Sequence, residues 1–330
     1  MADLADARAV LARYFPSAEF VQRLEPLGNA GGWSGSQLWR VGTPAGEFCL
    51  RRWPRQHPQP QQLVLIHTVM ARVSGDLPAV PLPQATTSGA TFVEQDGQLW
   101  ELVTWRPGKA DYRERPSRER LQAAMQTLAR FHTLAGRGQS VEPTVPPALC
   151  DRAERWAELA ASGVAAIERS LARPLGSEID QLAPRLLMLA CTAHNDPERN
   201  PGRWMHPQLP LQPAIRDIHR DHVLFTGDEV TGLIDFGAMR IDTPLADVAR
   251  LVGSLAGDDP EAREFALNAY SELRPLNDDD RGFIDLLDET GLILSAFNWL
   301  AWLYVERREM GPTAPIVRRL NEIMLRLAVR

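Results

Sequence analysis

The chain has 330 residues, of which 44% are hydrophobic and 24% are charged, a composition typical of an ordinary globular protein long enough for two lobes or domains. Its formal net charge of −6 argues against a nucleic-acid partner, because proteins that bind a phosphate backbone usually carry a basic face.

The start of the chain and its hydropathy indicate a cytoplasmic protein that does not bind membranes. The first fifteen residues contain Asp3 and Asp6 and lack the basic start and apolar run of a signal peptide. We find no segment with the roughly 18–20 apolar residues of a membrane span. Three widely spaced cysteines, Cys49, Cys150 and Cys191, lack metal-ligand spacing and are interpreted as small apolar side chains in a reducing compartment.

The first hundred residues are predicted to form a strand-rich lobe. Apolar side chains recur at helical spacing in two segments, and the remaining segments alternate between strands and glycine-containing turns. The predicted elements are a helix at 4–15, two strands joined by a turn from Gly42 to Gly46, a helix at 61–73, and two strands within 91–105 joined by the turn Asp96-Gly97.

From residue 117 onward, helices dominate the pattern. The first predicted helix carries Leu121, Met125, Leu128 and His132 on one face. The other predicted helices span residues 153–171, 184–191, 244–256, 260–273 and 282–309. Residues 194–214 are predicted as a loop, and two apolar runs around the turn 226–229 as a hairpin. His132, Trp299 and Trp302 lie on apolar helical faces and are interpreted as core. We expect an α+β fold with a small antiparallel-sheet lobe at 1–104, a larger helical lobe at 105–330 and a ligand cleft between them.

The predicted hairpin is flanked by aspartates that suit phosphoryl transfer. That reaction needs one carboxylate to accept the proton of the attacking hydroxyl and a second to hold Mg²⁺ against the nucleotide phosphates. Asp235, in the sequence Leu-Ile-Asp-Phe-Gly after the second strand, is the metal-ligand candidate. In kinase catalytic loops an asparagine follows the catalytic aspartate by five residues, just before a strand. The strand here begins at Val223, so His222 occupies that position and Asp217 is the predicted catalytic base.

Asp221 is the competing candidate. It belongs to His219-Arg220-Asp221, which looks like a kinase loop, but the fifth residue after it is Thr226, in the turn beyond the strand. We therefore favour Asp217.

His222 has several interpretations. It can orient Asp217 through a hydrogen bond, support a metal held mainly by Asp235, or bind a softer metal such as manganese, because Mg²⁺ prefers oxygen ligands. A histidine that simply packs at the start of a strand is the fourth alternative.

The segment from Arg216 to Leu251 resembles the core of the aminoglycoside phosphotransferase family, which are small-molecule kinases with a protein-kinase-like fold. The family pattern His-Gly-Asp-Leu-His-x-x-Asn, followed by Ile-Asp-Phe/Trp-Gly, Asp-Pro and Asp-Leu-Ala, matches this chain at several positions: Asp217, Ile218, His219, Asp235, Pro244, Asp247 and Ala249. Asp242 stands one residue before the position that the aspartate of the family's Asp-Pro motif would occupy. Weaker likenesses extend over residues 28–305, and they imply a bilobal kinase-like fold.

The resemblance also implies a nucleotide site. It assigns phosphate contacts to Gly31, Gly32, Ser34 and Gly35 of a glycine-rich loop and to Arg51, in the place of the family's lysine, and it assigns the nucleobase to a hinge at Leu102, Val103 and Trp105. The helix at 61–73 contains no glutamate to pair with that cation. Asp247 buttresses the catalytic loop in the family; from its position it is most simply a helix N-cap.

These features predict a phosphotransferase that moves the γ-phosphate of ATP or GTP, with Mg²⁺, to a hydroxyl of a small acceptor. A cationic acceptor is one option, because residues 257–290 contain eleven acidic and three basic side chains, although a solvated acidic face is the simpler interpretation. We expect a monomer or homodimer. The alternative is a catalytically impaired kinase-like protein that binds nucleotide or a partner without turnover.

Overall fold

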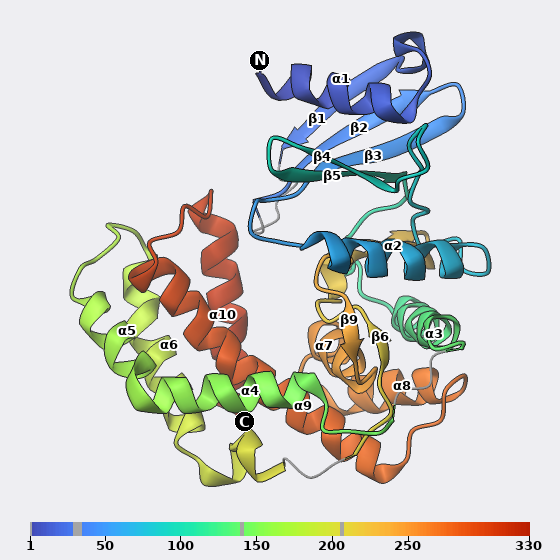
Figure 1. The fold of residues 1–330 in the computed structure, drawn as a ribbon. Helices are drawn as coiled ribbons and strands as arrows, with labels where there is room; N and C mark the ends of the chain where they lie inside the picture. The colour runs from blue at the N-terminus through green and yellow to red at the C-terminus, as the bar shows by residue number, and fades with distance from the viewer. Residues whose placement is uncertain (1, 29–34, 139–141, 205–207) are drawn as a thin grey trace. The chain divides into compact units, whose positions relative to one another are not determined.

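The computed structural model describes residues 2–28, 35–138, 142–204 and 208–330, and the chain forms two compact units (Figure 1). Unit 1 consists of Met1–Gln139, Pro213–Ile241 and Ala269–Arg274, and unit 2 consists of Ser140–Gln212, Asp242–Asn268 and Pro275–Arg330. Within the described ranges, no helix is both long and apolar enough to cross a membrane. The lobe boundary between residues 104 and 105 stays a prediction.

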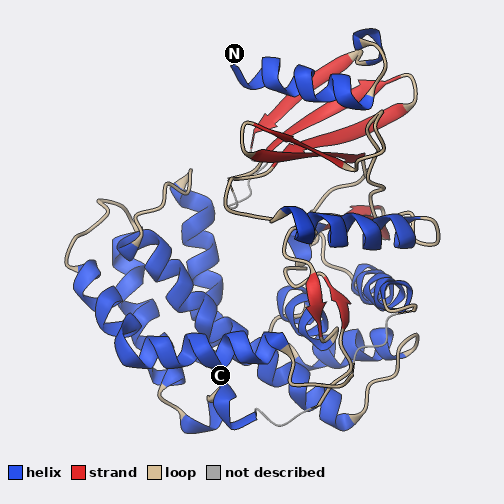
Figure 2. Cartoon of the chain, viewed as in Figure 1, coloured by secondary structure: helices blue, strands red, loops and turns tan. Residues whose placement is uncertain are grey.

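Unit 1 is built on a five-stranded antiparallel sheet with the order β1-β2-β3-β5-β4 (Figure 2). Its strands are β1 Arg23–Gly28, β2 Gln37–Thr43, β3 Gly46–Arg52, β4 Phe92–Gln95 and β5 Gln98–Thr104. The predicted turn between β4 and β5 is confirmed. Asp96 and Gly97 have φ angles of 53° and 70°, the left-handed values that a tight two-residue hairpin turn requires.

The leading helix α1 (Ala2–Tyr14) is confirmed, and it packs on one face of this sheet (Figure 1). Val10 and Leu11 are buried in one apolar cluster with Trp39 and Trp100, whose rings stack with centroids 5.3 Å apart. Burying a large apolar side chain contributes about 1.5–3 kcal/mol, so this contact stabilises the sheet against which the site is built.

Two helices and a hairpin complete the part of unit 1 that carries the site. They are α2 Pro60–Ser74, α3 Arg118–Ala135, β7 Val223–Thr226 and β8 Glu229–Leu233, and a further strand pair joins β6 Gln212–Ala214 to β9 Arg240–Asp242. The predicted hairpin is confirmed, with Val223 opposite Leu233. The amide of Leu233 also donates to the carbonyl of Ala79 at 2.8 Å. The pairing of Val223 with Leu233 therefore brings together the segment before β7 and the segment after β8.

Unit 2 is helical. Its elements are α4 Pro147–Glu158, α5 Val164–Leu171, α6 Ile179–His194, α7 Leu245–Leu255, most of α8 Pro260–Ser271, α9 Asp278–Leu300 and α10 Thr313–Val329. The π-helical turns Leu159–Gly163 and Ala301–Val305 follow α4 and α9. Most of these helices share one core, in which Trp299 is buried and Trp302 is partly buried.

The sequence prediction was wrong at three helix positions. Helix α4 begins at Pro147 and not at residue 153, and α6 begins at Ile179 with Pro184 inside it. The lost backbone hydrogen bond at Pro184 is outweighed because Ile179 and Ala183 bury the first turns of α6 in the core. Helix α10 was not predicted, although Ile316 begins a run of buried apolar positions at helical spacing.

The acidic stretch 257–290 has two structural roles. Asn277 and Asp280 form a capping box at the start of α9, where acidic side chains also complement the helix dipole. Asp288, whose side chain is 6% exposed, receives the guanidinium groups of three arginines: Arg263 at 2.8 Å, Arg326 at 2.8 Å and Arg330 at 2.7 Å. The interpretation of the whole stretch as a solvated face was therefore wrong for Asp288.

Gly253 in α7 and Gly282 in α9 form a matched pair for testing this packing. A Cβ at Gly253 would lie 2.0 Å from Oδ1 of Asp288, whereas a Cβ at Gly282 meets nothing within 4 Å. We expect Gly253→Ala to lower the free energy of unfolding by about 1–3 kcal/mol because the carboxylate must move. Gly282→Ala should raise it by about 0.5–1 kcal/mol, since alanine loses less backbone entropy on folding. Urea unfolding followed by tryptophan fluorescence measures both, and equal effects would contradict this packing.

Candidate active site

Arg51 on β3 and Asp235 after β8 form the central ion pair of the candidate site. Nη1 of Arg51 donates to Oδ1 of Asp235 at 2.9 Å, although the two residues are 184 positions apart. The guanidinium also stacks over the ring of Trp53 at 4.4 Å. Burial by itself would raise the pKa of the Asp235 carboxyl, but the nearby Arg51 and His222 outweigh it and lower that pKa. Asp235 is therefore ionised at neutral pH and suited to a cationic partner.

Asp235 has a backbone conformation unusual for a residue other than glycine, with φ at 62°. The neighbouring Gly237 explains why this turn is tight, because a Cβ there would lie 2.7 Å from the ring of Trp53. Gln62 of α2 donates through Nε2 to the carbonyl of Gly237 at 3.1 Å. The turn is thereby held against β3 and α2, and it presents the Asp235 carboxylate to Arg51.

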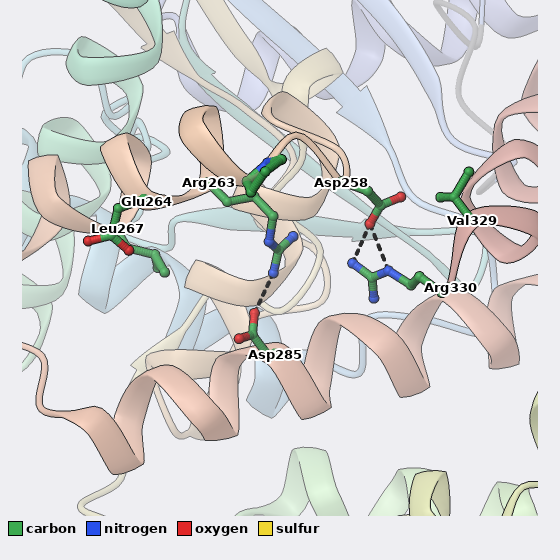
Figure 3. Close-up of a pocket in the computed structure, with 8 residues that line it drawn as sticks. Asp258, Arg263, Glu264, Leu267, Asp285, Val329 and Arg330 are labelled. Atoms are coloured by element: carbon green, nitrogen blue, oxygen red, sulfur yellow. Dashed lines mark hydrogen bonds and ion pairs between the residues drawn. The ribbon is translucent and has the colours of Figure 1, made fainter.

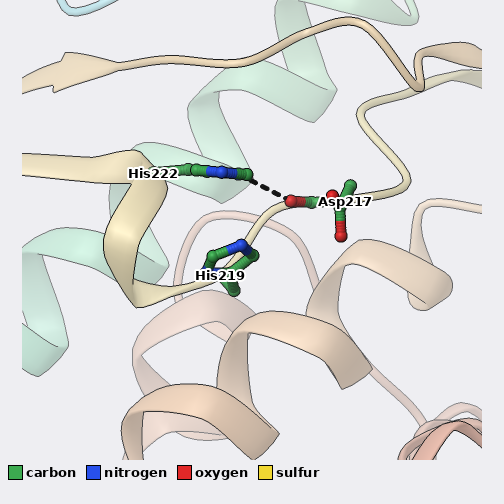
Figure 4. A group of neighbouring side chains, drawn as sticks. All are labelled: Asp217, His219 and His222. Atoms are coloured by element: carbon green, nitrogen blue, oxygen red, sulfur yellow. Dashed lines mark hydrogen bonds between the residues drawn. The ribbon is translucent and has the colours of Figure 1, made fainter. Parts of the chain in front are cut away.

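His222 approaches both predicted aspartates, and Figure 4 shows its hydrogen bond to the backbone of Asp217. Its Nδ1 donates to the backbone carbonyl of Asp217 at 2.8 Å, and its Nε2 lies 3.7 Å from Oδ2 of Asp235. The ring therefore connects the loop before the hairpin to the turn after it. Of the interpretations that the sequence left open, this geometry supports an orienting bond, although to the backbone of Asp217 and not to its carboxylate.

Asp217 and Asp221 differ in their surroundings. Asp217 is half-buried and is close enough to Asp235 for its charge to act on the pKa of that carboxyl. The side chain of Asp221 is 63% exposed and lies 3.6 Å from Nδ1 of His219. This placement supports Asp217 as the catalytic candidate, and the assignment stays a prediction.

Sequence reasoning missed His219 as a site residue. Its ring centroid lies 3.8 Å from that of His222, and ligand atoms of Asp217, His219 and His222 all lie within 4.8 Å of one another (Figure 4). The signal was present in the spacing Asp-x-His-x-x-His, which puts two imidazoles beside the predicted base.

Glu101 of β5 was missed as well. It is buried, its Oε1 lies 3.6 Å from Nε of Arg51, and its Oε2 lies 2.7 Å from Nε2 of His67 on α2. Nδ1 of His67 is in turn 2.8 Å from the hydroxyl of Thr91. The expectation that α2 offers no glutamate is confirmed, but Arg51 has a carboxylate partner from the adjacent strand, and His67 of α2 anchors that partner.

The predicted nucleotide contacts are only partly described. Gly31, Gly32 and Ser34 lie outside the described residues, whereas Gly35 is exposed with φ at 77°. In the predicted hinge at Leu102, Val103 and Trp105, several backbone groups already bond within the protein. The carbonyl of Leu102 accepts from Gln84 at 2.8 Å, and the amide of Trp105 donates to Glu47 at 2.9 Å. A nucleobase contact by this hinge would have to use other backbone groups.

Asp247 is not the N-cap of its helix. The cap position of α7 is Pro244, and Asp247 lies in the first turn, fully buried. The prediction of an N-cap was wrong because the helix starts two residues earlier than Asp247, at Leu245. Asp242 is also fully buried, and its Oδ1 accepts the amides of Ala148 at 3.1 Å and Thr243 at 2.7 Å.

A second candidate is a cavity of about 460 Å³ in unit 2 (Figure 3). Its charged lining consists of Asp258, Glu264 and Asp285 with Arg263 and Arg330. Asp258 and Asp285 already pair with these arginines. The cavity therefore contains no concentrated negative charge that would select a cationic ligand.

The donor atoms around His222 fit a divalent cation. One carboxylate oxygen of Asp235 faces the Nε2 atom of His222, and His222 also belongs to a group with Asp217 and His219 whose ligand atoms lie within 4.8 Å of one another. Carboxylates and imidazoles are common metal ligands. Asp235 and His222 are therefore the residues that would hold the ion, as predicted, and this assignment also stays a prediction.

Comparison with solved structures identifies the fold as that of small-molecule kinases. The chain is 12% identical to an amicoumacin kinase solved with AMP-PNP and Ca²⁺, with coverage of 98% and 96% of the two chains and a TM-score of 0.62. It is 16% identical to a microcompartment-associated aminopropanol kinase, with coverage of 98% and 95% and a TM-score of 0.60. An aminoglycoside phosphotransferase from Alicyclobacillus acidocaldarius is 15% identical, with coverage of 97% and 95% and a TM-score of 0.57.

The sequence itself defines the family. Residues 26–284 match the phosphotransferase enzyme family, and the chain belongs to this family. No curated protein sequence matches the chain. The predicted resemblance and the predicted fold class are thus confirmed.

Proposed function

We propose that the protein is a kinase that transfers the γ-phosphate of ATP or GTP to a hydroxyl of a small molecule. The observation that carries this proposal is the convergence of Arg51, Asp235, His222 and Asp217 within unit 1, at the positions where the family pattern predicts phosphoryl transfer. A triphosphate and a divalent cation are supported by the AMP-PNP and Ca²⁺ in the amicoumacin kinase structure.

Each residue has a proposed role. Asp217 accepts the proton of the acceptor hydroxyl and orients it for attack. Asp235 and His222 hold the divalent cation, which neutralises charge on the phosphate oxygens when bound. Arg51 contacts the phosphates, because a guanidinium is always charged and can bind two phosphate oxygens at once. Gly31, Gly32, Ser34 and Gly35 cover the phosphates, and Leu102, Val103 and Trp105 contact the base.

The non-catalytic alternative rests on two residues of the kinase pattern that the sequence lacks. Both losses have local replacements. Glu101 lies beside Arg51 in place of a glutamate from α2, and His222 faces Asp235 in place of an asparagine. These replacements favour the enzyme over a protein that binds nucleotide without turnover.

The acceptor class is tested with a panel. Formation of ADP or GDP is measured with amino alcohols, sugars and aminoglycosides, and product is checked by mass for one added phosphate. The aminopropanol kinase among the similar structures makes amino alcohols the first class to test. An acceptor-dependent rate is the expected result. Tight nucleotide binding with no phosphorylated product from any acceptor class would support the non-catalytic alternative.

Replacing Glu101 by glutamine is expected to raise the KM for the nucleotide by about tenfold, with a smaller change in kcat, because a charged partner of Arg51 is lost. Steady-state kinetics at varied nucleotide concentration measures KM and kcat separately. Glu94→Gln on the neighbouring strand is the control, because Glu94 is exposed. An unchanged KM in Glu101→Gln would show that Glu101 does not position Arg51.

A further inference from the structure

The ring of His222 is oriented as a metal ligand. Its Nδ1 is 2.8 Å from the backbone oxygen of Asp217, and since a carbonyl can only accept, Nδ1 carries the proton. In the uncharged ring, Nε2 then has a lone pair. A hydrogen bond from the nitrogen that does not ligate is the usual way in which proteins orient a metal-binding histidine.

Nε2 of His222 faces an oxygen of Asp235 at a suitable distance. The separation from Oδ2 is 3.7 Å, which is too long for a hydrogen bond. It is close to the spacing of two ligands on one ion, since bonds of about 2.0–2.2 Å place adjacent ligands roughly 3–3.6 Å apart. Arg51 pairs with the other oxygen, Oδ1, at 2.9 Å. The two oxygens of Asp235 thus face different partners.

The surrounding side chains add further donors of the same kind. His219 and Asp217 lie with His222 in a group whose ligand atoms are all within 4.8 Å of one another (Figure 4). Nδ1 of His219 accepts from the amide of Asp221 at 3.3 Å, so its Nε2 carries the proton in the uncharged ring and is less ready to ligate than that of His222. The group combines the Asp217 carboxylate with at least one imidazole nitrogen that is ready to bind.

We propose that this site takes a first-row transition cation such as Mn²⁺ in preference to Mg²⁺, with Nε2 of His222 and Oδ2 of Asp235 as ligands. Mg²⁺ favours oxygen ligands in near-octahedral geometry, whereas imidazole nitrogen suits transition metals. An asparagine at position 222 would supply an oxygen, so this single position sets the preference. The inference rests on the proposed function and specifies the cation with which that kinase works.

The test measures cation binding to the full-length protein without nucleotide or acceptor. Electron paramagnetic resonance follows free Mn²⁺ during a titration, and Mg²⁺ affinity is obtained by competition. His222→Asn should weaken Mn²⁺ binding by about 10–100-fold and change Mg²⁺ binding by less than about threefold. Pulsed electron paramagnetic resonance on bound Mn²⁺ should show magnetic coupling to a directly bound imidazole nitrogen in the unmodified protein. This coupling should be lost in His222→Asn.

Asp221→Asn is the matched control, because it removes a carboxylate from the same loop that is 63% exposed. It should leave both affinities and the nitrogen coupling unchanged. Absence of nitrogen coupling, or an equal loss of Mn²⁺ and Mg²⁺ binding in His222→Asn with an unchanged melting temperature, would overturn the proposal. Phosphoryl transfer is assayed separately. If bound Mn²⁺ shows nitrogen coupling but no phosphoryl transfer is detected, the kinase proposal fails and the metal assignment stands. If phosphoryl transfer is detected but bound Mn²⁺ shows no nitrogen coupling, the metal assignment fails and the kinase proposal stands.

Discussion

Replacing Asp217 by asparagine is expected to lower kcat by about 10²–10⁴-fold, the usual contribution of a positioned general base. Asparagine retains the size of the side chain and leaves the backbone bond from Nδ1 of His222 to the carbonyl of residue 217 in place. The loss should therefore appear in kcat, with little change in the KM for the nucleotide. Steady-state kinetics with the best acceptor of the panel measures both quantities.

Asp221→Asn is the matched control for this prediction. Asp221 stands four residues later in the same loop and completes the His-Arg-Asp sequence that imitates a kinase loop, but its side chain is 63% exposed. We expect its kcat to fall by less than about tenfold, since its exposed carboxylate is not predicted to touch the acceptor. A large loss in Asp221→Asn together with near-normal activity in Asp217→Asn would reverse the assignment.

The choice between these two aspartates shows what local sequence spacing can predict. Asp217 is found by counting back from the start of the strand at Val223, and this strand begins where the apolar run begins. The turn Asp96-Gly97 was predictable for the same reason, because both residues tolerate left-handed backbone angles. Local chemistry determined the strand start and the turn, so a single sequence was sufficient to find these two features. The choice of Asp217 as the base stays a prediction.

Contacts between distant residues were not predictable in this way. Glu101 could be recognised as an acidic residue in an apolar strand, but its partner His67 is 34 positions away on a helix. A buried carboxylate requires a partner, yet the pattern does not say which one. The pairing of Arg51 with both Glu101 and Asp235 likewise depends on how β3, β5 and the turn after β8 come together.

Helix boundaries failed where tertiary packing overrode local signals. Pro315 in the first turn of α10 is tolerated because backbone amides at a helix start have no partner within the helix. Pro184 lies deeper in α6, where burial of the same helix face compensates for the lost bond. The predicted start of this helix at Pro184 was wrong for that reason, because the helix begins at Ile179.

Asp288→Asn is expected to lower the free energy of unfolding at pH 7 by about 3–5 kcal/mol, because it removes a buried anion that three partly buried arginines share. Asp288 accepts Arg263, Arg326 and Arg330 at 2.7–2.8 Å. Urea unfolding followed by tryptophan fluorescence measures the loss. Asp285→Asn is the control: its side chain is 63% exposed and pairs with Arg263, so a change below about 1 kcal/mol is expected.

The pH dependence of this difference gives an independent check on its cause. Burial by itself would raise the pKa of the Asp288 carboxyl, but Arg326, Arg330 and Arg263 outweigh it and hold the pKa below its ordinary value of 3.8. A carboxyl with a lowered folded-state pKa contributes stability that is complete above the unfolded-state pKa and is lost as the pH falls through the folded-state pKa. The gap between the unmodified protein and Asp288→Asn should therefore be constant from pH 7 to about pH 5 and shrink below about pH 4. A gap that persists unchanged in acid would mean that Asp288 stabilises the protein by packing and not by its charge.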